Sequence, residues 1–212
     1  MEPPSDVPDG TCTIWYVTAG IRGKQALLDA AIDYVAANGI RDRSLREIAA
    51  GLGSSHRMLI YHFGSKEGLL VEIVRTMERR QRAVLDELSR QRHDSPTEVA
   101  RVFWERVTDP ALWPHERLFF EIYGRALHGD PAVRPVLDGI VETWIEPLAH
   151  ALHQAGVDPA QARAHARLGL AVARGLLLDL LATGDRAAVD DAMGMYIAMY
   201  ETTMPTDPAA ST

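Results

Sequence analysis

The side chains best suited to recognition chemistry lie within residues 44–66, SLREIAAGLGSSHRMLIYHFGSK. They combine hydrogen-bonding, cationic and aromatic groups, which are the types that contact the phosphates and base edges of duplex DNA. The predicted nucleic-acid contacts are Ser44, Ser55, His56, Arg57, Ile60, Tyr61, His62 and Lys66. Arg57 offers a planar fork suited to guanine, whereas Lys66, beside a helix start, suits a phosphate. This chemistry is binding rather than catalysis.

Two short helices must position these side chains. Ser44 and Glu47 have the spacing of a capping box, so a helix is expected to begin there. Its apolar side chains at Leu45, Ile48, Ala49 and Leu52 fall on one face. Gly53 allows a tight turn, Ser54 or Ser55 can cap a second helix, and Gly64 ends it. The pattern predicts a helix-turn-helix rather than a buried helical hairpin, because outward Arg and His side chains gain nothing from burial.

The motifs of this stretch resemble those of the TetR family of bacterial transcriptional repressors. They are Leu45-Arg46-Glu47-Ile48-Ala49, Leu52-Gly53, Leu59, Tyr61-His62-Phe63 and Ser65-Lys66-Glu67-Gly68-Leu69-Leu70, and the match covers residues 22–75. The resemblance implies an all-α homodimer whose second helix enters the major groove of a palindromic operator. It also implies a larger domain whose small-molecule effector releases DNA. Met58 and Ile60 depart from the usual pattern, so the operator sequence does not follow from the family.

Charge is distributed unevenly along the chain. The 212 residues carry a net charge of −7, which by itself argues against binding nucleic acid. Residues 22–66, however, hold seven basic and four acidic side chains, a net +3, so the remainder carries −10. A basic end is drawn to phosphates while an acidic body is repelled. The single cysteine, Cys12, cannot form an intramolecular disulfide, which favours a cytoplasmic protein.

The chain is expected to contain two domains. Residues 1–20 contain three prolines and no basic segment typical of a signal peptide, so they are expected to form a mostly disordered arm. The helix-turn-helix domain is predicted over 21–66, beginning with a helix at about 23–38. The second domain is predicted over 67–205, followed by a disordered tail at 206–212. A long helix from Lys66 to about Arg92 should connect the domains, and no apolar run is long enough to cross a membrane.

Proline marks the helix starts of the second domain. Pro96, Pro110, Pro131 and Pro159 each follow a Ser or Asp, the pattern of proline at the first helical position behind a cap. The predicted helices run from these starts to about 107, 128, 155 and 183, and a further one covers 186–203. The whole chain is therefore predicted to be all-α.

The last two of these helices are the predicted dimerisation surface. The helix over 159–183 is apolar on more than one face, and such a helix must be covered on both sides. With the helix over 186–203 it could pair with its own copy as a four-helix interface. The predicted contacts are Leu170, Ala173, Leu177, Leu180, Met193 and Ile197.

An aromatic cluster in the second domain suggests a binding site for a small, mainly apolar molecule. Its members are Trp104, Trp113, Phe119, Phe120, Tyr123 and Trp144, with Arg125, Glu121 or His115 as polar contacts. Each aromatic could equally be part of the core, so the prediction concerns the cluster rather than any single member.

No cofactor, metal or enzymatic activity is predicted. His150 and His153 are three residues apart, but no Glu or Cys stands at ligand spacing, and paired surface histidines are commoner than metal ligands. The sequence lacks a phosphate-binding loop and a nucleophile elbow. Two functions remain: a ligand-responsive DNA-binding repressor, or a helical small-molecule-binding protein or enzyme whose helix-turn-helix is only structural. Sequence-specific binding to duplex DNA would distinguish them.

Overall fold

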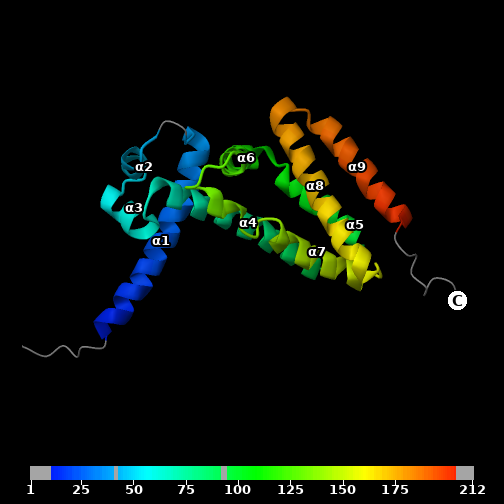
Figure 1. Ribbon diagram of the computed structural model, residues 1–212, viewed down its shortest axis with the longest axis horizontal. Coiled ribbons are helices and arrows are strands. Elements are labelled where there is room, and N and C mark those ends of the chain that lie inside the picture. The colour runs from blue at the N-terminus through cyan, green and yellow to red at the C-terminus, as the bar shows by residue number, and fades with distance from the viewer. Residues whose placement is uncertain (1–10, 41–42, 92–94, 204–212) are drawn as a thin grey trace, which may run out of the picture. The chain divides into compact units, whose positions relative to one another are not determined.

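The computed structural model describes residues 11–40, 43–91 and 95–203, and all regular structure within these ranges is helical (Figure 1). The helices form two compact units, Met1–Ile73 and Val74–Thr212. The division lies inside a continuous helix, two turns beyond the boundary expected at residue 66. The predicted tail at 206–212 lies outside the described residues. None of the described helices is long and apolar enough to span a membrane.

Four helices contribute to the first unit. They are α1 (Thr11–Asn38), α2 (Leu45–Gly51), α3 (His56–Phe63) and the beginning of α4 (Lys66–Arg90). Each supplies side chains with almost no exposed surface, namely Leu28, Ala31, Ile32, Val35, Ile48, Leu59, Leu69 and Leu70. Helices as short as α2 and α3 are unstable alone in water, so this shared core must hold them.

The N-terminal helix is longer than the sequence indicated. We expected a disordered arm as far as residue 20, but α1 begins at Thr11. No proline lies between Thr11 and Asn38. Extending an existing helix gains a hydrogen bond without the cost of a new nucleus, so helix continues through Gly20 and Gly23. The first ten residues of the predicted arm lie outside the described residues.

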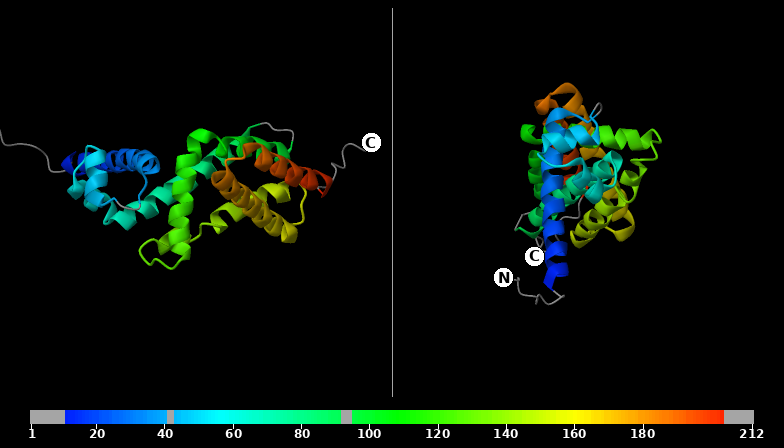
Figure 2. Two further views of the ribbon diagram at one scale, coloured as in Figure 1. Left: turned by 90° about the horizontal axis from the view of Figure 1, so that it is seen from above. Right: turned by 90° about the vertical axis from the view of Figure 1, so that its left-hand side faces the viewer.

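The second unit contains the rest of α4 and the remaining helices (Figure 2). These are α5 (Pro96–Val107), η1 (Pro110–Leu112), α6 (Trp113–Leu127), η2 (Arg134–Leu137), α7 (Glu142–Gln154), α8 (Pro159–Thr183) and α9 (Arg186–Thr203). Helices α8 and α9 form a hairpin that turns at Gly184, and α7 packs along α8. One core cluster joins α5, α8 and α9, and another joins α7 to α8.

All four predicted Ser or Asp caps form, but only three of them begin a helix where expected. Asp130 accepts a hydrogen bond from the amide of Ala132 (3.0 Å), yet turns and the short η2 follow instead of an α-helix to residue 155. Pro135 removes a backbone donor there, and Gly139 has φ +70°. Helix α7 therefore starts only at Glu142. The apolar residues Val133, Val136 and Ile140 are nevertheless buried.

Candidate nucleic-acid interface and cavity

The start of α2 is fixed by the predicted capping box. The Ser44 hydroxyl accepts from the Glu47 amide (3.3 Å), and the Ser44 amide donates to the Glu47 carboxylate (2.7 Å). These bonds from Ser44 hold the pKa of Glu47 below its usual value. The Ser44 hydroxyl also donates to the same carboxylate (2.7 Å). Its hydrogen-bonding capacity is therefore largely used within the protein, which weakens its assignment as a DNA contact.

The turn between α2 and α3 also forms as predicted. Gly53 adopts φ +63°, and the amide of Ser54 donates to the carbonyl of Ala49 (2.9 Å). The Ser55 hydroxyl then caps α3 by accepting from the Met58 amide (3.2 Å). Both ends of the turn are thus fixed by local hydrogen bonds, and these set the direction in which α3 leaves α2.

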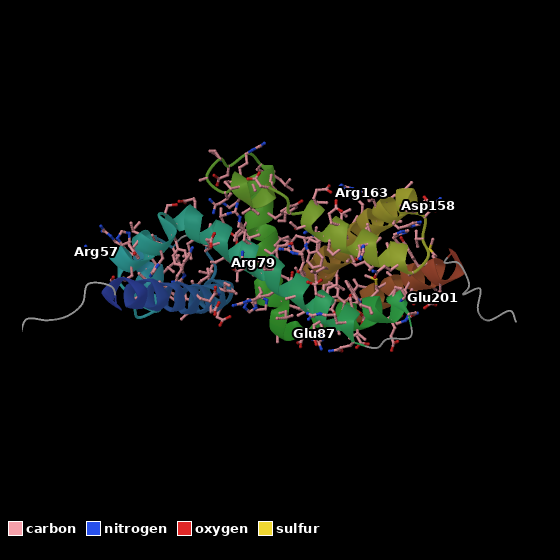
Figure 3. The ribbon with its side chains drawn as sticks, turned by 90° about the horizontal axis from the view of Figure 1, so that it is seen from below. Arg57, Arg79, Glu87, Asp158, Arg163 and Glu201 are labelled. Carbon is pink, nitrogen blue, oxygen red and sulfur yellow. The ribbon has the colours of Figure 1, made fainter. Side chains whose placement is uncertain are left out.

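Helix α3 has one buried face and one exposed face. Leu59 and Phe63 point into the core, whereas Tyr61 is 77% exposed and Ile60 is 41% exposed. Arg57 is exposed and points away from the protein in Figure 3. Its side chain forms no ion pair with any residue in the described parts of the chain. The guanidinium is therefore available to a partner.

The remaining predicted contacts on α3 are partly covered. His56 and His62 are half-buried, and the ring of His62 packs edge-on against Tyr61 with centroids 5.0 Å apart. The exposed face of α3 thus offers a guanidinium, a phenol and imidazole edges. These groups can donate to phosphates and base edges, and Ile60 can make an apolar contact.

Lys66 has a structural contact that sequence reasoning missed. Its ammonium group donates to the carbonyl of Ile40 (2.9 Å), so it ties the start of α4 to the segment that follows α1. A lysine ammonium has three donors, so a phosphate contact stays a prediction. The structural bond means, however, that replacing Lys66 would alter the fold as well as any contact with DNA.

Helices α3 and α4 approach each other too closely for a side chain at Gly68. A Cβ atom there would lie 2.1 Å from the carbonyl oxygen of Phe63. The Ser65 hydroxyl accepts from the Gly68 amide (2.9 Å) and caps α4 at the same point. The glycine therefore fixes the short connection through which α3 is joined to the long helix.

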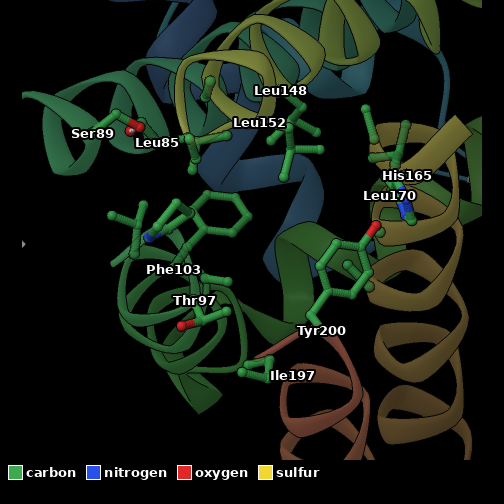
Figure 4. Close-up of a pocket in the computed structure, with 18 of the residues that line it drawn as sticks. Leu85, Ser89, Thr97, Phe103, Leu148, Leu152, His165, Leu170, Ile197 and Tyr200 are labelled. Atoms are coloured by element: carbon green, nitrogen blue, oxygen red, sulfur yellow. Dashed lines mark hydrogen bonds between the residues drawn. The ribbon is translucent and has the colours of Figure 1, made fainter. Parts of the chain in front are cut away.

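The second unit contains a cavity of about 510 Å³ bounded by α4, α5, α7, α8 and α9 (Figure 4). Aliphatic and aromatic side chains make up most of its wall. Leu85 comes from α4, Phe103 from α5, Leu152 from α7, Leu170 from α8 and Ile197 from α9. The volume lies in the range of small-molecule sites.

The predicted aromatic cluster contributes only in part to this cavity. Trp104 and Trp144 line it, whereas Trp113, Phe119, Phe120 and Tyr123 do not. The last four have other contacts: Trp113 donates to the Thr108 carbonyl (3.1 Å) and packs with Phe120 on the core of α5, α8 and α9. Phe119 and Tyr123 stack on each other with centroids 5.6 Å apart.

The proposed polar contacts Arg125, Glu121 and His115 are also absent from the cavity wall. Sequence reasoning missed Phe103, His165, Tyr196 and Tyr200, which do line it. The signal for α9 was the spacing of Met193, Tyr196, Ile197 and Tyr200, which places them on one helical face.

A buried polar network lies behind Trp144. The indole nitrogen of Trp144 donates to the carboxylate of Glu78 on α4. Glu78 also accepts from Arg174 (3.0 Å) and Arg82 (3.2 Å). One wall residue of the cavity is therefore hydrogen-bonded directly to the long helix.

Glu116 extends this network into α6. Its side chain is buried and accepts a hydrogen bond from Gln81 (2.5 Å). Burial, together with the nearby charge of Glu78, raises the pKa of Glu116 to about 7. Near neutral pH this carboxyl group is therefore partly protonated.

The predicted dimerisation residues require a correction. Leu177, Leu180, Met193 and Ile197 are buried in the chain's own core with Trp104, so they have little surface for a partner. Leu170 and Ala173 are half-buried and line the cavity. The large apolar side chains that α8 and α9 expose are instead Leu168, Leu178, Met195 and Met199.

Comparison with known proteins gives a consistent result for the fold and the first unit. Residues 27–73 match the sequence model described as bacterial regulatory proteins, tetR family. No curated protein sequence matches the chain.

Solved structures resemble nearly the whole chain. A transcriptional regulator from Rhodococcus sp. Rha1 has a TM-score of 0.73 and 23% identity, covering 87% of this chain and 99% of its own. A TetR transcriptional regulator from Legionella pneumophila has a TM-score of 0.66 and 21% identity, covering 82% and 94%. The multidrug binding protein EbrR, complexed with imidazole, has a TM-score of 0.61 and 28% identity, covering 89% and 98%.

Proposed function

We propose that this chain is a repressor that a small apolar molecule releases from its operator. Residues 27–73 match the TetR family of bacterial transcriptional regulators, which is the family of the chain. The observation that carries the proposal is the exposed polar face of α3, held on a capped turn. Arg57 on this face has no carboxylate partner among the described residues and is free to pair with a base or a phosphate.

Helix α3 is the recognition helix in this proposal. Arg57 would pair with a guanine in the major groove, while Ser55, His56, Tyr61 and His62 would contact flanking bases or phosphates. The net +3 of residues 22–66 would draw this end towards DNA, and the net −10 of the remaining chain would keep the body away.

The operator is proposed to be palindromic because the regulator is proposed to act as a dimer. Leu168 and Leu178 on α8, with Met195 and Met199 on α9, form an exposed apolar surface on one helical hairpin. Small residues such as Ala171 and Gly175 lie between them on the exposed side of α8 and would allow a second copy to approach closely. Two linked recognition helices bind a palindrome far more tightly than one because the second contact is intramolecular.

The cavity is the proposed effector site. Its size and mainly apolar wall support this role, and EbrR, which has the same fold, is described as a multidrug binding protein. Helix α4 begins at Lys66 in the first unit, while its residues Leu85 and Ser89 line the cavity. A ligand that shifts α4 would therefore change the spacing of two recognition helices. By reciprocity, operator DNA must weaken ligand binding by the same factor.

Binding to DNA from the region upstream of the gene and its divergently transcribed neighbour tests the proposal. We expect the protein to bind one duplex there at least about 1,000-fold more tightly than a scrambled duplex at the same salt concentration. Equal affinity for both duplexes would instead support a helical binding protein whose helix-turn-helix is only structural.

A further inference from the structure

We propose that the cavity selects an uncharged, mainly apolar molecule that places one hydrogen-bonding group against Tyr200 and His165. The inference deepens the proposed function: binding of such a molecule stands by itself, whereas its effect on DNA rests on that function. Three features of the cavity carry it, namely the absence of charged residues from the described part of its wall, the charges behind Trp144 and the polar end between α8 and α9.

The described part of the cavity wall contains no Asp, Glu, Lys or Arg side chain. An ion that binds there gives up part of its hydration and meets no opposite charge among the described wall residues, which disfavours its binding. A neutral molecule loses much less hydration and gains from burying its apolar surface. The wall therefore favours uncharged ligands over anions and cations of the same shape.

Aromatic rings can hold a cation without a carboxylate, so the faces of the wall aromatics decide whether cations are also excluded. The guanidinium carbon of Arg82 lies 5.7 Å from the centre of the Trp144 ring. Arg82 and Arg174 both pair with Glu78. Glu116, the other carboxyl group of this network, is partly protonated near neutral pH, so the group behind this wall has more positive than negative charge. A ligand cation beside Trp144 would meet a ring already occupied by a cation and a region with excess positive charge.

Most hydroxyl and amide groups of the wall are already used within the protein. Ser89 donates to the carbonyl of Leu85 (2.8 Å), and the hydroxyls of Ser95 and Thr97 bond to each other (2.8 Å). Gln154 bonds to His150 (2.9 Å). These groups leave little hydrogen-bonding capacity on the sides of the cavity formed by α4, α5 and α7.

The opposite side offers a phenol and an imidazole. In Figure 4 the hydroxyl of Tyr200 points towards His165, and their ring centroids are 5.1 Å apart. Tyr196 packs against Tyr200 with centroids 5.2 Å apart. Burial raises the pKa of Tyr200, so its phenol stays neutral. The hydroxyl of Tyr200 also interacts with that of Tyr196. A phenol and an imidazole each combine donor and acceptor capacity, so Tyr200 and His165 can still bind a ligand hydroxyl or carbonyl.

Four probes built on one biphenyl rod test the selection: biphenyl, 4-phenylphenol, biphenyl-4-carboxylate and biphenyl-4-ylmethylammonium. Equilibrium dialysis against the full-length protein without DNA gives their dissociation constants. We expect 4-phenylphenol to bind most tightly and biphenyl about 5-fold more weakly, because one hydrogen bond contributes about 1 kcal/mol. Both charged probes should bind at least about 100-fold more weakly than 4-phenylphenol, since each must be desolvated without a counter-charge.

A pair of conservative variants assigns the hydrogen bond. Tyr200→Phe should reduce the affinity for 4-phenylphenol to that for biphenyl and leave biphenyl itself unchanged. Tyr123→Phe is the matched control, because Tyr123 lies outside the cavity wall, and it should change neither affinity.

The proposal is overturned if either charged probe binds as tightly as 4-phenylphenol, or if none of the four probes binds below millimolar concentration. An equal loss of affinity for biphenyl and 4-phenylphenol in Tyr200→Phe would overturn the assigned anchor.

An operator-binding assay with 4-phenylphenol separates this inference from the proposed function. If the probe binds but leaves operator affinity unchanged, ligand selection stands and effector release fails. If only a charged molecule binds and releases DNA, the proposed function stands and the selection fails.

Discussion

Replacing Glu116 by glutamine should remove a pH-dependent loss of stability. The pKa of Glu116 is about 7 in the folded protein, compared with 4.5 for a glutamate exposed to water, as in the unfolded chain. Between these values the folded state binds a proton that the unfolded state has released, so stability falls as pH rises. The full contribution is present below pH 4.5 and is lost as pH passes about 7.

The size of the effect follows from the shift in pKa. Each pKa unit corresponds to 1.36 kcal/mol, so the 2.5 units between 4.5 and about 7 give a loss of about 3 kcal/mol as an upper bound. A glutamine keeps the size of the side chain and can still bond to Gln81, but it does not ionise. The wild-type protein should therefore lose about 3 kcal/mol more than Glu116→Gln between pH 4.5 and pH 8.

Denaturant unfolding of both proteins at one protein concentration, at intervals from pH 4.5 to pH 8, measures this difference. A fixed concentration is needed because the proposed dimerisation would add to apparent stability. Glu105→Gln is the matched control, since Glu105 lies exposed on α5 and should give a curve parallel to the wild type. If the difference between wild type and Glu116→Gln does not change with pH, the carboxyl group is ionised in the folded state and the reasoning is wrong.

Three further predictions concern the proposed dimer, the proposed recognition helix and the α3–α4 connection. Leu178→Glu should separate the subunits but leave them folded, whereas Leu177→Glu, one residue away in the core, should unfold the second unit. Sedimentation and circular dichroism distinguish these results. A folded dimer of Leu178→Glu would refute the proposed surface. Arg57→Ala should cost about 1–3 kcal/mol per half-site and relax the preference at one symmetric pair of bases, and a uniform loss on all duplexes in a binding titration would make it a phosphate contact. Gly68→Ala should lower the free energy of unfolding by about 1–3 kcal/mol because its Cβ would lie 2.1 Å from a backbone carbonyl oxygen. Gly124→Ala, in open space on α6, should raise the free energy of unfolding by up to about 1 kcal/mol. If thermal unfolding ranks the two variants in the opposite order, the close approach at Gly68 is contradicted.

Local signals were sufficient to predict the helix-turn-helix of α2 and α3. The Ser44 capping box, the glycine turn at Gly53 and the cap at Ser55 act over three or four residues, so their outcome does not depend on the rest of the chain. The same is true of the caps before α5 and α8. In contrast, residues 130–141 have apolar side chains at helical spacing, but Pro135 and Gly139 prevent a continuous helix there.

Assignments that depend on tertiary contacts were less successful. The sequence shows that α8 is apolar on several faces, but it does not show which face meets the chain's own core. Leu177 and Leu178 differ by one position, yet only Leu178 is exposed. The aromatics present the same problem: Trp104 and Phe119 are both buried, and only the arrangement of α5, α7 and α9 around the cavity distinguishes a wall residue from a core residue.

Helix α8 contributes side chains to the core, to the cavity wall and to the outer surface, and this limits how its sequence can be changed by engineering or by evolution. Leu180 packs in the core, Ala173 lines the cavity and Leu178 faces outwards, so a substitution on any side of α8 disturbs stability, selectivity or the exposed apolar surface. Helices α5 and α7 impose fewer constraints, because the small side chains of Ala100 and Ala151 line the cavity and are largely exposed. A mutant library aimed at new ligands for the proposed effector site should therefore vary these two helices and leave α8 unchanged. Natural relatives that bind different ligands at this site should differ first at these positions.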